Sequence, residues 1–298
     1  MKKKIFITGA NSFIGKNLLK KISDNYNFYG IDKLSSKLDN IKKIDLCSKK
    51  LEFFVQKDTD FVVNLAAISN DQSCNLDLIS CYQTNIVGLI NLLEIIKKKK
   101  IKNLIHASTE WVYEENTKVH SEAEKIFYEN IKSHYALTKL FNEQILRIFH
   151  ENNKEINITC LRFGIVYGKR KKNWSAFESI IDKVIKKKIL TVGSLKTGRH
   201  FIHIDDIVRA IIISFNHSGF NIFNVQGKDF VTLDMLIKES TKLLNKKIKI
   251  KETSSNMPSV RKMSLSKTKK KLMFNANISY KQGVREIINF FKNDKQSS

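Results

Sequence analysis

A tyrosine and a lysine spaced four residues apart form the pair best suited to proton transfer in this sequence. They are Tyr135 and Lys139, in the segment SHYALTK. On a helix, residues four apart lie on one face, so the two side chains would be neighbours. Tyrosine is a poor base at neutral pH because its ordinary pKa is about 10. A lysine ammonium one turn away, together with a further cation, would lower that pKa and let the phenol exchange a proton with a substrate hydroxyl. Without more context, the pair could also be two surface residues of an amphipathic helix.

A threonine hydroxyl lies upstream of this pair, at the end of a predicted strand. Thr109 follows the apolar strand predicted over 101–108, about 26 residues before Tyr135. In open α/β sheets, ligands bind at the carboxyl edge of the strands. A hydroxyl at that edge can hydrogen-bond a substrate oxygen that is being oxidised. We therefore predict that Thr109, Tyr135 and Lys139 form the catalytic group.

The N-terminal residues have the pattern of a phosphate-binding turn. A short strand is predicted from Lys4 to Thr8, and apolar residues from Phe13 to Ser23 recur at helical spacing. Between them, Gly9 permits a tight turn, the small Ser12 lets the backbone approach a phosphate, and Gly15 lets the helix pack on the strand. The N–H groups at the start of the helix would then face the anion. Ser12 stands where glycine is usual, so the motif is weaker than the full glycine pattern.

An aspartate follows the second predicted strand. Asp32 comes directly after the strand predicted from Asn27 to Ile31, about 20 residues past the glycines. A carboxylate at this place can accept hydrogen bonds from a ribose and repels the extra phosphate of NADP, so the sequence favours NAD. Lys33 leaves NADP open, because a neighbouring cation could partly accommodate that phosphate. An oxidised nicotinamide would also supply the further cation beside Tyr135.

Strands and helices alternate along the first half of the chain. Further strands are predicted over 41–46, 60–67 and 156–163, and helices over 48–57, 75–99, 133–152 and 174–188. This alternation predicts an α/β fold with a doubly wound parallel sheet, the Rossmann arrangement. We predict an NAD-binding Rossmann domain over 1–165 and a smaller, mainly substrate-binding region over 166–298, with some segments returning to the first domain.

The cysteine and histidine patterns predict neither a metal site nor a disulfide. The four cysteines include no Cys-x-x-Cys pair, and we interpret them as reduced thiols of a cytoplasmic protein. His200 and His203 are three residues apart, but the segment FIHIDD is predicted to be a strand, which would place them on opposite faces. No apolar run approaches the ~20 residues of a membrane span. We therefore expect a soluble protein without a membrane partner.

The sequence carries a formal net charge of +24. Three explanations are open: a general abundance of lysine, attraction of an acidic substrate, or binding of nucleic acid. Seven of the 53 basic residues are arginine, whereas proteins that read nucleic acids rely on arginine for bidentate contacts. We therefore favour a compositional origin and expect no nucleic-acid partner.

Together, these motifs resemble the extended short-chain dehydrogenase/reductase family of NAD-dependent nucleotide-sugar epimerases and dehydratases. The segment TGANSFIG resembles the family's TGxxGFIG turn, and YALTK resembles its Tyr-Lys pair. STEWVY resembles the active-site strand end, which places the catalytic hydroxyl on Thr109 rather than Ser108. Further segments resemble the family along nearly the whole chain: VVNLAA, NIVGLINLLE, LRFGIVYG, GRHFIHIDD and GVREIINFF.

The resemblance implies which residues bind cofactor and substrate. The residues implied to bind NAD are Gly9, Asn11, Ser12, Phe13, Ile14, Gly15, Asp32, Asp45, Leu46, Leu65, Ala66, Ala67, Tyr135 and Lys139. Those implied to bind a nucleotide-sugar substrate are Thr109, Glu110, Arg199 and Arg261, with Arg199 on a phosphate. The resemblance also implies a homodimer, in which the helices near 85–99 and 133–149 pair into a four-helix bundle.

Departures from the family pattern narrow the expected reaction. Ile165 stands where many members carry a substrate-contacting asparagine, and a basic run over 169–172 follows Gly168 where proline is common. Dehydratases of the family place Asp-Glu after the catalytic threonine, whereas this sequence has Glu110 and Trp111. We therefore predict an epimerase that forms a transient keto sugar. A reductase or dehydratase of the same fold is the alternative, and a non-catalytic dinucleotide sensor or RNA-binding protein is an alternative of another class.

Overall fold

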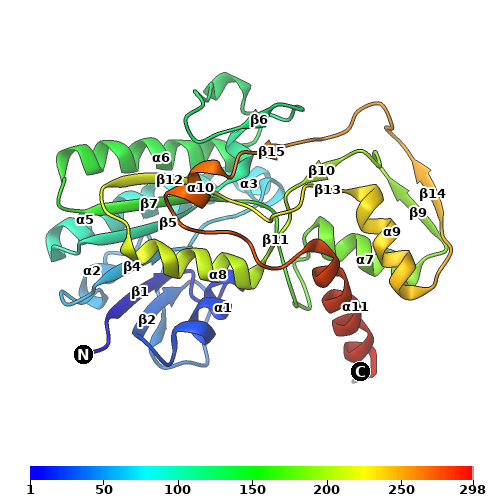
Figure 1. Ribbon diagram of the computed structural model, residues 1–298. Helices are drawn as coiled ribbons and strands as arrows, with labels where there is room; N and C mark the ends of the chain where they lie inside the picture. The colour runs from blue at the N-terminus through cyan, green and yellow to red at the C-terminus, as the bar shows by residue number, and fades with distance from the viewer. Residues whose placement is uncertain (297–298) are drawn as a thin grey trace. The chain divides into compact units, whose positions relative to one another are not determined.

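The computed structural model describes residues 1–296, and within them seven strands form one sheet (Figure 1). Its spatial order is β12-β7-β5-β4-β1-β2-β3, and β1 pairs in parallel with both β2 and β4. The strands are β1 Lys4–Thr8, β2 Asn27–Asp32, β3 Ile41–Lys43, β4 Phe61–Asn64, β5 Asn103–Thr109, β7 Asn157–Phe163 and β12 Phe220–Val225. The strand order reverses at β1, which confirms the predicted doubly wound α/β fold.

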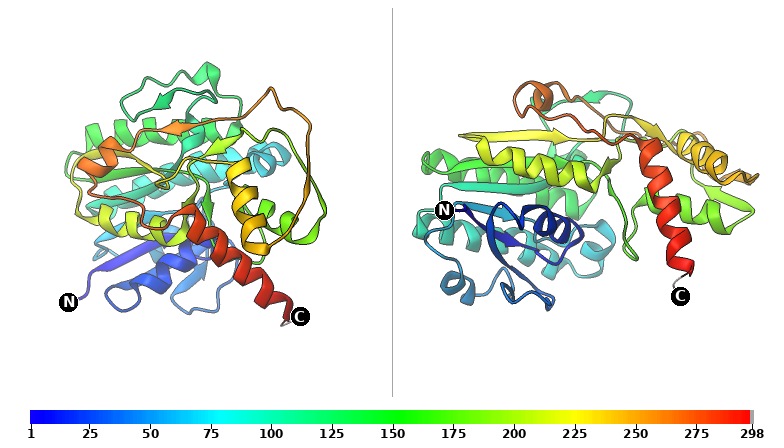
Figure 2. Two further views of the ribbon diagram at one scale, coloured as in Figure 1. Left: turned by 45° about the vertical axis from the view of Figure 1, so that its right-hand side comes forward. Right: turned by 60° about the horizontal axis from the view of Figure 1, so that its bottom comes forward.

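Helices cover both faces of this sheet (Figure 2). On one face lie α2 Lys50–Phe54, α5 Gly88–Lys99 and α6 His134–Asn152, which share a buried cluster with alternate strand residues. On the other face, Phe61 of β4 stacks on Phe215, which follows α8 Ile204–Ile213, with ring centroids 4.5 Å apart. Strands buried on both faces explain the continuous apolar runs in the sequence.

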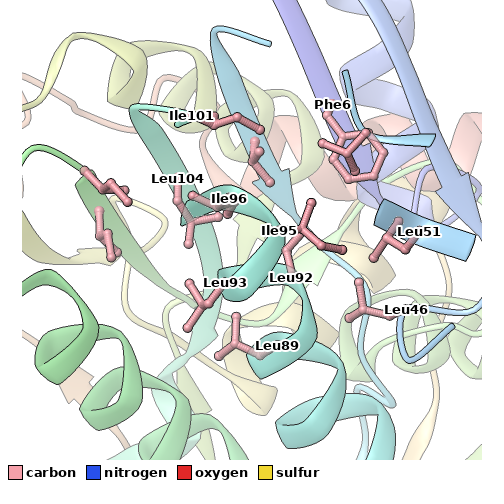
Figure 3. Close-up of a cluster of buried hydrophobic side chains, with 14 of the residues drawn as sticks. Phe6, Leu46, Leu51, Leu89, Leu92, Leu93, Ile95, Ile96, Ile101 and Leu104 are labelled. Carbon is pink, nitrogen blue, oxygen red and sulfur yellow. The ribbon is translucent and has the colours of Figure 1, made fainter. Parts of the chain in front are cut away.

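The core on the α5 face fixes the strands that carry the site residues. Figure 3 shows the leucine and isoleucine side chains of α5, Leu92 and Ile96 among them, in one cluster with Phe6 of β1, Leu104 of β5 and Leu51 of α2. All five of these side chains are 0% or 1% exposed. Burying one such side chain stabilises the fold by roughly 1.5–3 kcal/mol. This packing joins β1 and β5 to the helices on this face of the sheet.

The described residues divide into two compact units. The first comprises 1–112, 125–162 and 208–223, and the second comprises 113–124, 163–207 and the residues from 224 onward. Residues 113–124 thus belong to the second unit and 208–223 to the first, and the domain boundary at 165 stays a prediction. The strands of the second unit that lie outside the large sheet are β6 Val119–His120, β8 Val166–Tyr167, β9 Ile189–Val192, β10 Gly198–Arg199, β11 Ile202–His203, β13 Val231–Thr232, β14 Lys249–Glu252 and β15 Lys262–Met263. Its helices are α7 Ala176–Lys186, α9 Leu233–Leu244, α10 Ser266–Lys270 and α11 Tyr280–Gln296.

Two predicted elements differ in detail from the structure. The helix predicted over 75–99 is interrupted: α3 Asp71–Leu76 ends before α4 Leu78–Tyr82, and a π-helical turn, η1 Gln83–Val87, joins α4 to α5. The strand predicted for FIHIDD is wrong beyond β11, because α8 begins at Ile204. Two aspartates in the first turn of α8 favour the helix, since acidic side chains stabilise a helix N-terminus.

The cysteines also differ from the prediction. Cys74 of α3 and Cys81 of α4 form a disulfide, whereas Cys47 and Cys160 are free thiols. The prediction of four reduced thiols is therefore wrong for the first pair. The break between α3 and α4 brings the two cysteines together. No cysteine motif in the sequence predicts this pairing.

One helical run meets the length and composition of a membrane span, contrary to the expectation from the sequence. Within Leu78–Lys99, an 18-residue window has a mean hydropathy of 1.3, and 44% of the residues in this window are buried. The buried share includes the α5 side chains of the core cluster. The α5 part of this run is packed in the core of the first unit.

Candidate active site

The turn after β1 lies against the end of β4 at the carboxyl edge of the sheet. Gly9 has a φ of +68°, a left-handed conformation that favours glycine. A Cβ on Gly9 would lie 2.8 Å from Ala66 N, and a Cβ on Gly15 would lie 2.5 Å from the Gly9 oxygen. Thr8 Oγ1 accepts a hydrogen bond from Ala66 N at 3.2 Å. The structure thus gathers three predicted cofactor residues where the strand order reverses, the usual ligand position in such sheets.

Ser12 has a capping role that the sequence analysis missed. Its Oγ accepts a hydrogen bond from Gly15 N at 3.0 Å and caps α1 Phe13–Ile22. Serine is one of the preferred residues at a helix N-cap. The serine that replaces the usual glycine therefore stabilises the helix whose N-terminus would face a pyrophosphate. Phe13 and Ile14 form the first turn of this helix and are partly buried.

Asp32 ties the end of β2 to the turn after β1. Its Oδ2 accepts a hydrogen bond from Asn11 N at 2.9 Å, and its Oδ1 accepts one from Leu34 N at 2.9 Å. Asn11 Nδ2 donates to the Leu34 oxygen at 3.0 Å. Because Asp32 is only partly buried, its carboxylate lies where a ribose hydroxyl can also reach it.

The other predicted cofactor residues have differing environments. Asp45 is exposed, and its Oδ1 accepts a hydrogen bond from Cys47 N at 2.8 Å. The Leu46 side chain is 4% exposed and belongs to the core cluster beside α5. Leu65 and Ala67 are partly buried on either side of Ala66. The structure therefore places 65–67 beside the β1 turn and assigns the Leu46 side chain to packing.

Thr109, Tyr135 and Lys139 lie together in the first unit. Thr109 ends β5, and its side chain is hydrogen-bonded to that of Tyr135 in the first turn of α6. Lys139 lies one turn later, is 3% exposed, and donates from Nζ to the Ala107 oxygen at 2.8 Å. The helical spacing thus brings the predicted catalytic residues to the end of one strand.

Burial controls the proton affinities of this group. It raises the pKa of Tyr135 to about 12, an effect that the hydrogen bond with Thr109 partly opposes. It lowers the pKa of Lys139 to about 8, while the charges of Cys160 and Glu143 oppose that shift. Desolvation penalises the charged forms of both groups. The lower Tyr135 pKa predicted from Lys139 and an oxidised nicotinamide is therefore not reached by the protein's own groups.

A buried ion pair supports α6 beneath the catalytic lysine. Glu143 lies one turn after Lys139, with its Oε2 2.6 Å from Arg162 Nη2 and its Oε1 2.9 Å from Arg162 Nε. Ser108 Oγ donates to Glu143 Oε1 at 2.5 Å. Ser108 thus belongs to this network, whereas Thr109 is bonded to Tyr135. The continued four-residue spacing from Tyr135 through Lys139 to Glu143 is the sequence signal that places Glu143 on the same face of the helix.

A second polar chain runs beneath the site across three strands. Thr8 Oγ1 donates to Asn64 Oδ1 at 2.5 Å, and Asn64 Nδ2 lies 3.1 Å from His106 Nδ1. Burial, with a smaller effect of the Lys139 charge, lowers the pKa of His106 well below its usual range. His106 is therefore neutral near pH 7, and Lys139 carries the positive charge at this position.

Asn85 connects the loop after β4 to the catalytic helix. Its Oδ1 accepts a hydrogen bond from Ile68 N at 2.8 Å, and its Nδ2 donates to Thr138 Oγ1 at 3.0 Å. Asn85 lies in the π-helical turn η1, and such turns are frequent at functional sites. The sequence predicted Asn85 to lie inside the helix over 75–99, and its bridging role was not predicted.

The two residues after Thr109 have different positions. Trp111 packs edge-on against the Tyr135 ring, with centroids 6.3 Å apart and an interplanar angle of 70°. Glu110, predicted to bind substrate, is 0% exposed in the short helix η2 Glu110–Val112. The indole is therefore a neighbour of the catalytic phenol, and the carboxyl group lies below the surface.

Arg199 and Arg261 lie in the second unit and contact one carboxylate. Glu115 Oε1 lies 2.9 Å from an Nη2 atom of each arginine. Each arginine residue is 7% exposed. The structure thus brings together the two arginines that were predicted to bind substrate. It also reveals Glu115, which the sequence analysis missed because the partners lie 84 residues or more apart in the chain.

The first unit has the features that a dinucleotide requires. The turn at Gly9 and Gly15 leaves no space for a Cβ, so it packs closely on the end of β4 and on the start of α1. A helix N-terminus at such a turn is the position at which a pyrophosphate binds. Asp32 offers carboxylate oxygens to a ribose at the end of β2. The residues of this turn therefore fit NAD.

Comparisons with known proteins agree with this reading. A family model described as the NAD dependent epimerase/dehydratase family matches residues 5–225. A UDP-glucuronate 4-epimerase from Thermodesulfobacterium geofontis is 29% identical over 287 residues, which cover 93% of this chain and 82% of that protein. The structure of UDP-glucuronic acid 4-epimerase from Bacillus cereus in complex with UDP-glucuronic acid and NAD is 26% identical, with a TM-score of 0.86 over 97% of this chain and 99% of that chain. UDP-N-acetylglucosamine 4-epimerase from Methanobrevibacter ruminantium M1 is also 26% identical, with a TM-score of 0.87 over 99% and 100% of the chains. The non-catalytic alternative gains no support from these comparisons.

Proposed function

The chain belongs to the NAD-dependent epimerase/dehydratase family, and from this premise we propose that it is a 4-epimerase of a UDP-linked sugar. The observation that carries the proposal is the group formed by Thr109, Tyr135 and Lys139 at the end of β5. The relatives described above, which are named as UDP-sugar 4-epimerases, support the choice of reaction and of nucleotide.

The three residues have distinct tasks in this reaction. Bound NAD supplies a hydride acceptor and donor and, when oxidised, a positive charge beside the phenol. Tyr135 Oη, as phenolate, takes the proton from the sugar hydroxyl that is oxidised. Thr109 hydrogen-bonds the reacting oxygen, and the Lys139 ammonium stabilises the phenolate. After the keto sugar has turned, Tyr135 returns the proton to the sugar oxygen. With the hydride that bound NAD would accept and give back, the product would have the mass of the substrate.

The position of Trp111 favours epimerisation over dehydration. Loss of water requires a further acid or base beside the phenol. Here the residue whose ring lies 6.3 Å from that of Tyr135 is an indole, which serves as neither. Glu110, the residue directly before Trp111, is 0% exposed. A dehydratase would need a carboxyl group from elsewhere in the chain.

Product analysis on a panel of sugar nucleotides tests the proposal. The protein is incubated with NAD and UDP-glucuronate first, then with other UDP-, dTDP- and GDP-sugars, and products are separated by chromatography with mass detection. A new peak of unchanged mass is expected from a UDP-sugar. Loss of water or of carbon dioxide would replace the epimerase by a dehydratase or a decarboxylase, and no product from any sugar would contradict the enzymatic assignment.

We also propose that two copies of the chain associate through an apolar face of α5 and α6. Four side chains on or beside these helices are 40–53% exposed: Val87, Ile90, Phe141 and Ile148. Val87 and Ile90 are three residues apart, and Phe141 and Ile148 are seven apart, so each pair lies on one helix face. Contiguous exposed apolar side chains mark protein interfaces. A second copy would form a four-helix bundle with this face.

Light scattering coupled to gel filtration tests the dimer. The wild-type protein is expected at twice the chain mass of 34.5 kDa, and Phe141→Asp with Ile148→Asp is expected at the monomer mass. Ile189→Asp is the matched control, because Ile189 is 57% exposed on β9 of the second unit and belongs to neither α5 nor α6. A monomeric wild type, or a double variant that stays dimeric, would refute the interface.

A further inference from the structure

We propose that Glu115 competes with the diphosphate of the substrate for Arg199 and Arg261, so that a nucleotide sugar must displace this carboxylate to bind. The proposal rests on the proposed function, since it takes the arginines as the diphosphate ligands. It assigns to Glu115 a role in setting the apparent affinity of the protein for the substrate diphosphate.

The three side chains form a two-pronged anion site. Glu115 Oε1 lies 2.9 Å from Nη2 of Arg199 and 2.9 Å from Nη2 of Arg261. The two guanidinium groups therefore converge on one oxygen atom. Guanidinium groups this close repel each other, and an anion between them offsets that repulsion. Geometry of this kind matches the oxygens of a diphosphate at least as well as one carboxylate oxygen.

Neutral groups hold the arginines in this orientation. Arg199 Nη1 donates to the oxygens of Gly198 at 2.9 Å and Ser259 at 2.7 Å. Arg261 Nε donates to the Tyr113 oxygen at 3.0 Å. These carbonyls fix the planes of the guanidinium groups without cancelling their charge. The arginines are thus preorganised, and a ligand need not pay for ordering them.

Glu115 is the partner that can leave. Its side chain is 45% exposed, whereas each arginine side chain is 8% exposed. It lies in an exposed stretch between two buried residues, Tyr113 and His120, whose rings stack with centroids 5.1 Å apart. Tyr113 Oη also donates to Asn224 Oδ1 at 2.9 Å. With both ends of the stretch anchored, the Glu115 carboxylate can swing into water while the arginines stay buried.

Competition of this kind sets a threshold for binding. The apparent affinity of a ligand falls by the fraction of protein in which its site is open. If Glu115 occupies the arginines in about nine of ten molecules, a ligand binds about tenfold more weakly than to the open site. A diphosphate has the charge and the oxygen atoms to replace the carboxylate, whereas a nucleoside without phosphate gains nothing from the arginines. Glu115 therefore lowers the apparent affinity of every ligand that must bind both arginines, the substrate diphosphate among them.

Titration of the NAD-loaded protein with UDP tests this role at constant salt. Glu115→Gln keeps the size of the side chain and removes its charge. We expect its dissociation constant for UDP to fall about three- to tenfold, with KM for the sugar nucleotide falling and kcat unchanged. Glu114→Gln is the matched control, because it removes the neighbouring exposed carboxylate, whose Oε2 accepts from Asn116 Nδ2 at 3.4 Å, and it should bind UDP as the wild type does.

The outcomes separate this inference from the proposed function. If the wild type binds UDP and Glu115→Gln binds it equally or more weakly, the competition is refuted and Glu115 serves only to orient the arginines. If the wild type neither binds UDP nor converts any sugar nucleotide, the proposed function fails. Titration with inorganic pyrophosphate then decides the inference: tighter binding to Glu115→Gln than to wild type supports the displaceable carboxylate, and equal or absent binding overturns it.

Discussion

Lys139 Nζ donates a hydrogen bond to the main-chain oxygen of Ala107 at 2.8 Å, which ties the catalytic helix α6 to the strand that ends at Thr109. This bond sets one end of the group, and the hydrogen bond between Thr109 and Tyr135 sets the other. The phenol is therefore held by its own helix and by the neighbouring strand. Single substitutions at Tyr135 and at Thr109 therefore test the phenol and the hydrogen bond that lowers its pKa one at a time.

Replacing Tyr135 by phenylalanine should abolish turnover and leave cofactor binding intact. The variant keeps the aromatic ring beside Trp111 and loses the group that exchanges the proton. We expect kcat to fall by about 10³-fold or more, while NAD released on denaturation stays at the wild-type amount. Tyr128→Phe is the control, because Tyr128 is 68% exposed. Turnover of Tyr135→Phe near the wild-type rate would remove the phenol from the mechanism.

Replacing Thr109 by valine should move the pH dependence of the rate. Turnover requires the phenolate, so the rate rises with pH through the pKa of Tyr135. The hydrogen bond with Thr109 lowers that pKa, and its loss must shift the rising limb to higher pH. We expect about a 10- to 100-fold loss of kcat at pH 7, partly recovered at high pH. Above pH about 8, Lys139 loses its charge in either protein.

A serine substitution provides the comparison for that profile. Ser108→Ala removes a hydroxyl that is bonded to Glu143 rather than to Tyr135. Its rising limb should coincide with that of the wild type, even if the protein is less stable. A rising limb in Thr109→Val that also coincides with the wild type would show that Thr109 does not set the pKa of the phenol.

Breaking the buried pair of Glu143 and Arg162 should destabilise the fold strongly. Their side chains are 0% and 4% exposed, so Glu143→Gln leaves a buried guanidinium without its counter-charge. We expect a loss of about 3–5 kcal/mol in the free energy of unfolding, measured with urea. Glu143→Leu combined with Arg162→Met should recover most of it, because an apolar pair of similar volume leaves no buried charge. Glu151→Gln, in a half-exposed pair with Arg147, should change the midpoint little, and an equal loss there would contradict the reasoning.

Labelling of thiols should distinguish the disulfide from four reduced cysteines. In the denatured protein without reductant, Cys47 and Cys160 should react and Cys74 and Cys81 should not, because the latter two are bonded. Mass spectrometry after alkylation should therefore show two labels, and four after reduction. Four labels without reductant would restore the original prediction of reduced thiols.

The disulfide should contribute modestly to stability. It closes a short loop, since its cysteines are seven residues apart, and loops of that size are stabilised by about 2 kcal/mol on the chain-entropy account. Urea unfolding with and without reductant measures the difference. Cys47→Ser, which alters a free thiol, is the control and should respond to reductant as the wild type does.

The local patterns of the sequence were enough to predict the fold class. They also predicted which site residues lie together on one helix or at one strand end. The strand, turn and helix around Gly9 follow from residues that are neighbours in the chain. So does the pairing of Tyr135 with Lys139, because a helix places residues four apart on one face. The alternation of apolar segments then predicted the sheet that brings the strand ends together.

Other features required the tertiary structure, because they join residues that no local period relates. Ser12 was interpreted as a residue that weakens the glycine motif. Its capping hydrogen bond with Gly15 N is seen only in the folded turn. The burial that raises the pKa of Tyr135 depends on everything packed around it. The helix break that brings Cys74 to Cys81 likewise has no signature in the residue pattern.

By itself, the sequence determined the chemistry available at the site: a phenol, an ammonium and a hydroxyl at the carboxyl edge of a dinucleotide-binding sheet. The tertiary structure alone decided how these groups are charged and what opposes substrate binding. Desolvation and ion pairing depend on which distant residues come into contact, as Glu143 does with Arg162 and Glu115 with both arginines. The physical reason is that a helical or strand period records only which face a side chain occupies, whereas its electrostatic energy depends on every charge and solvent molecule around it.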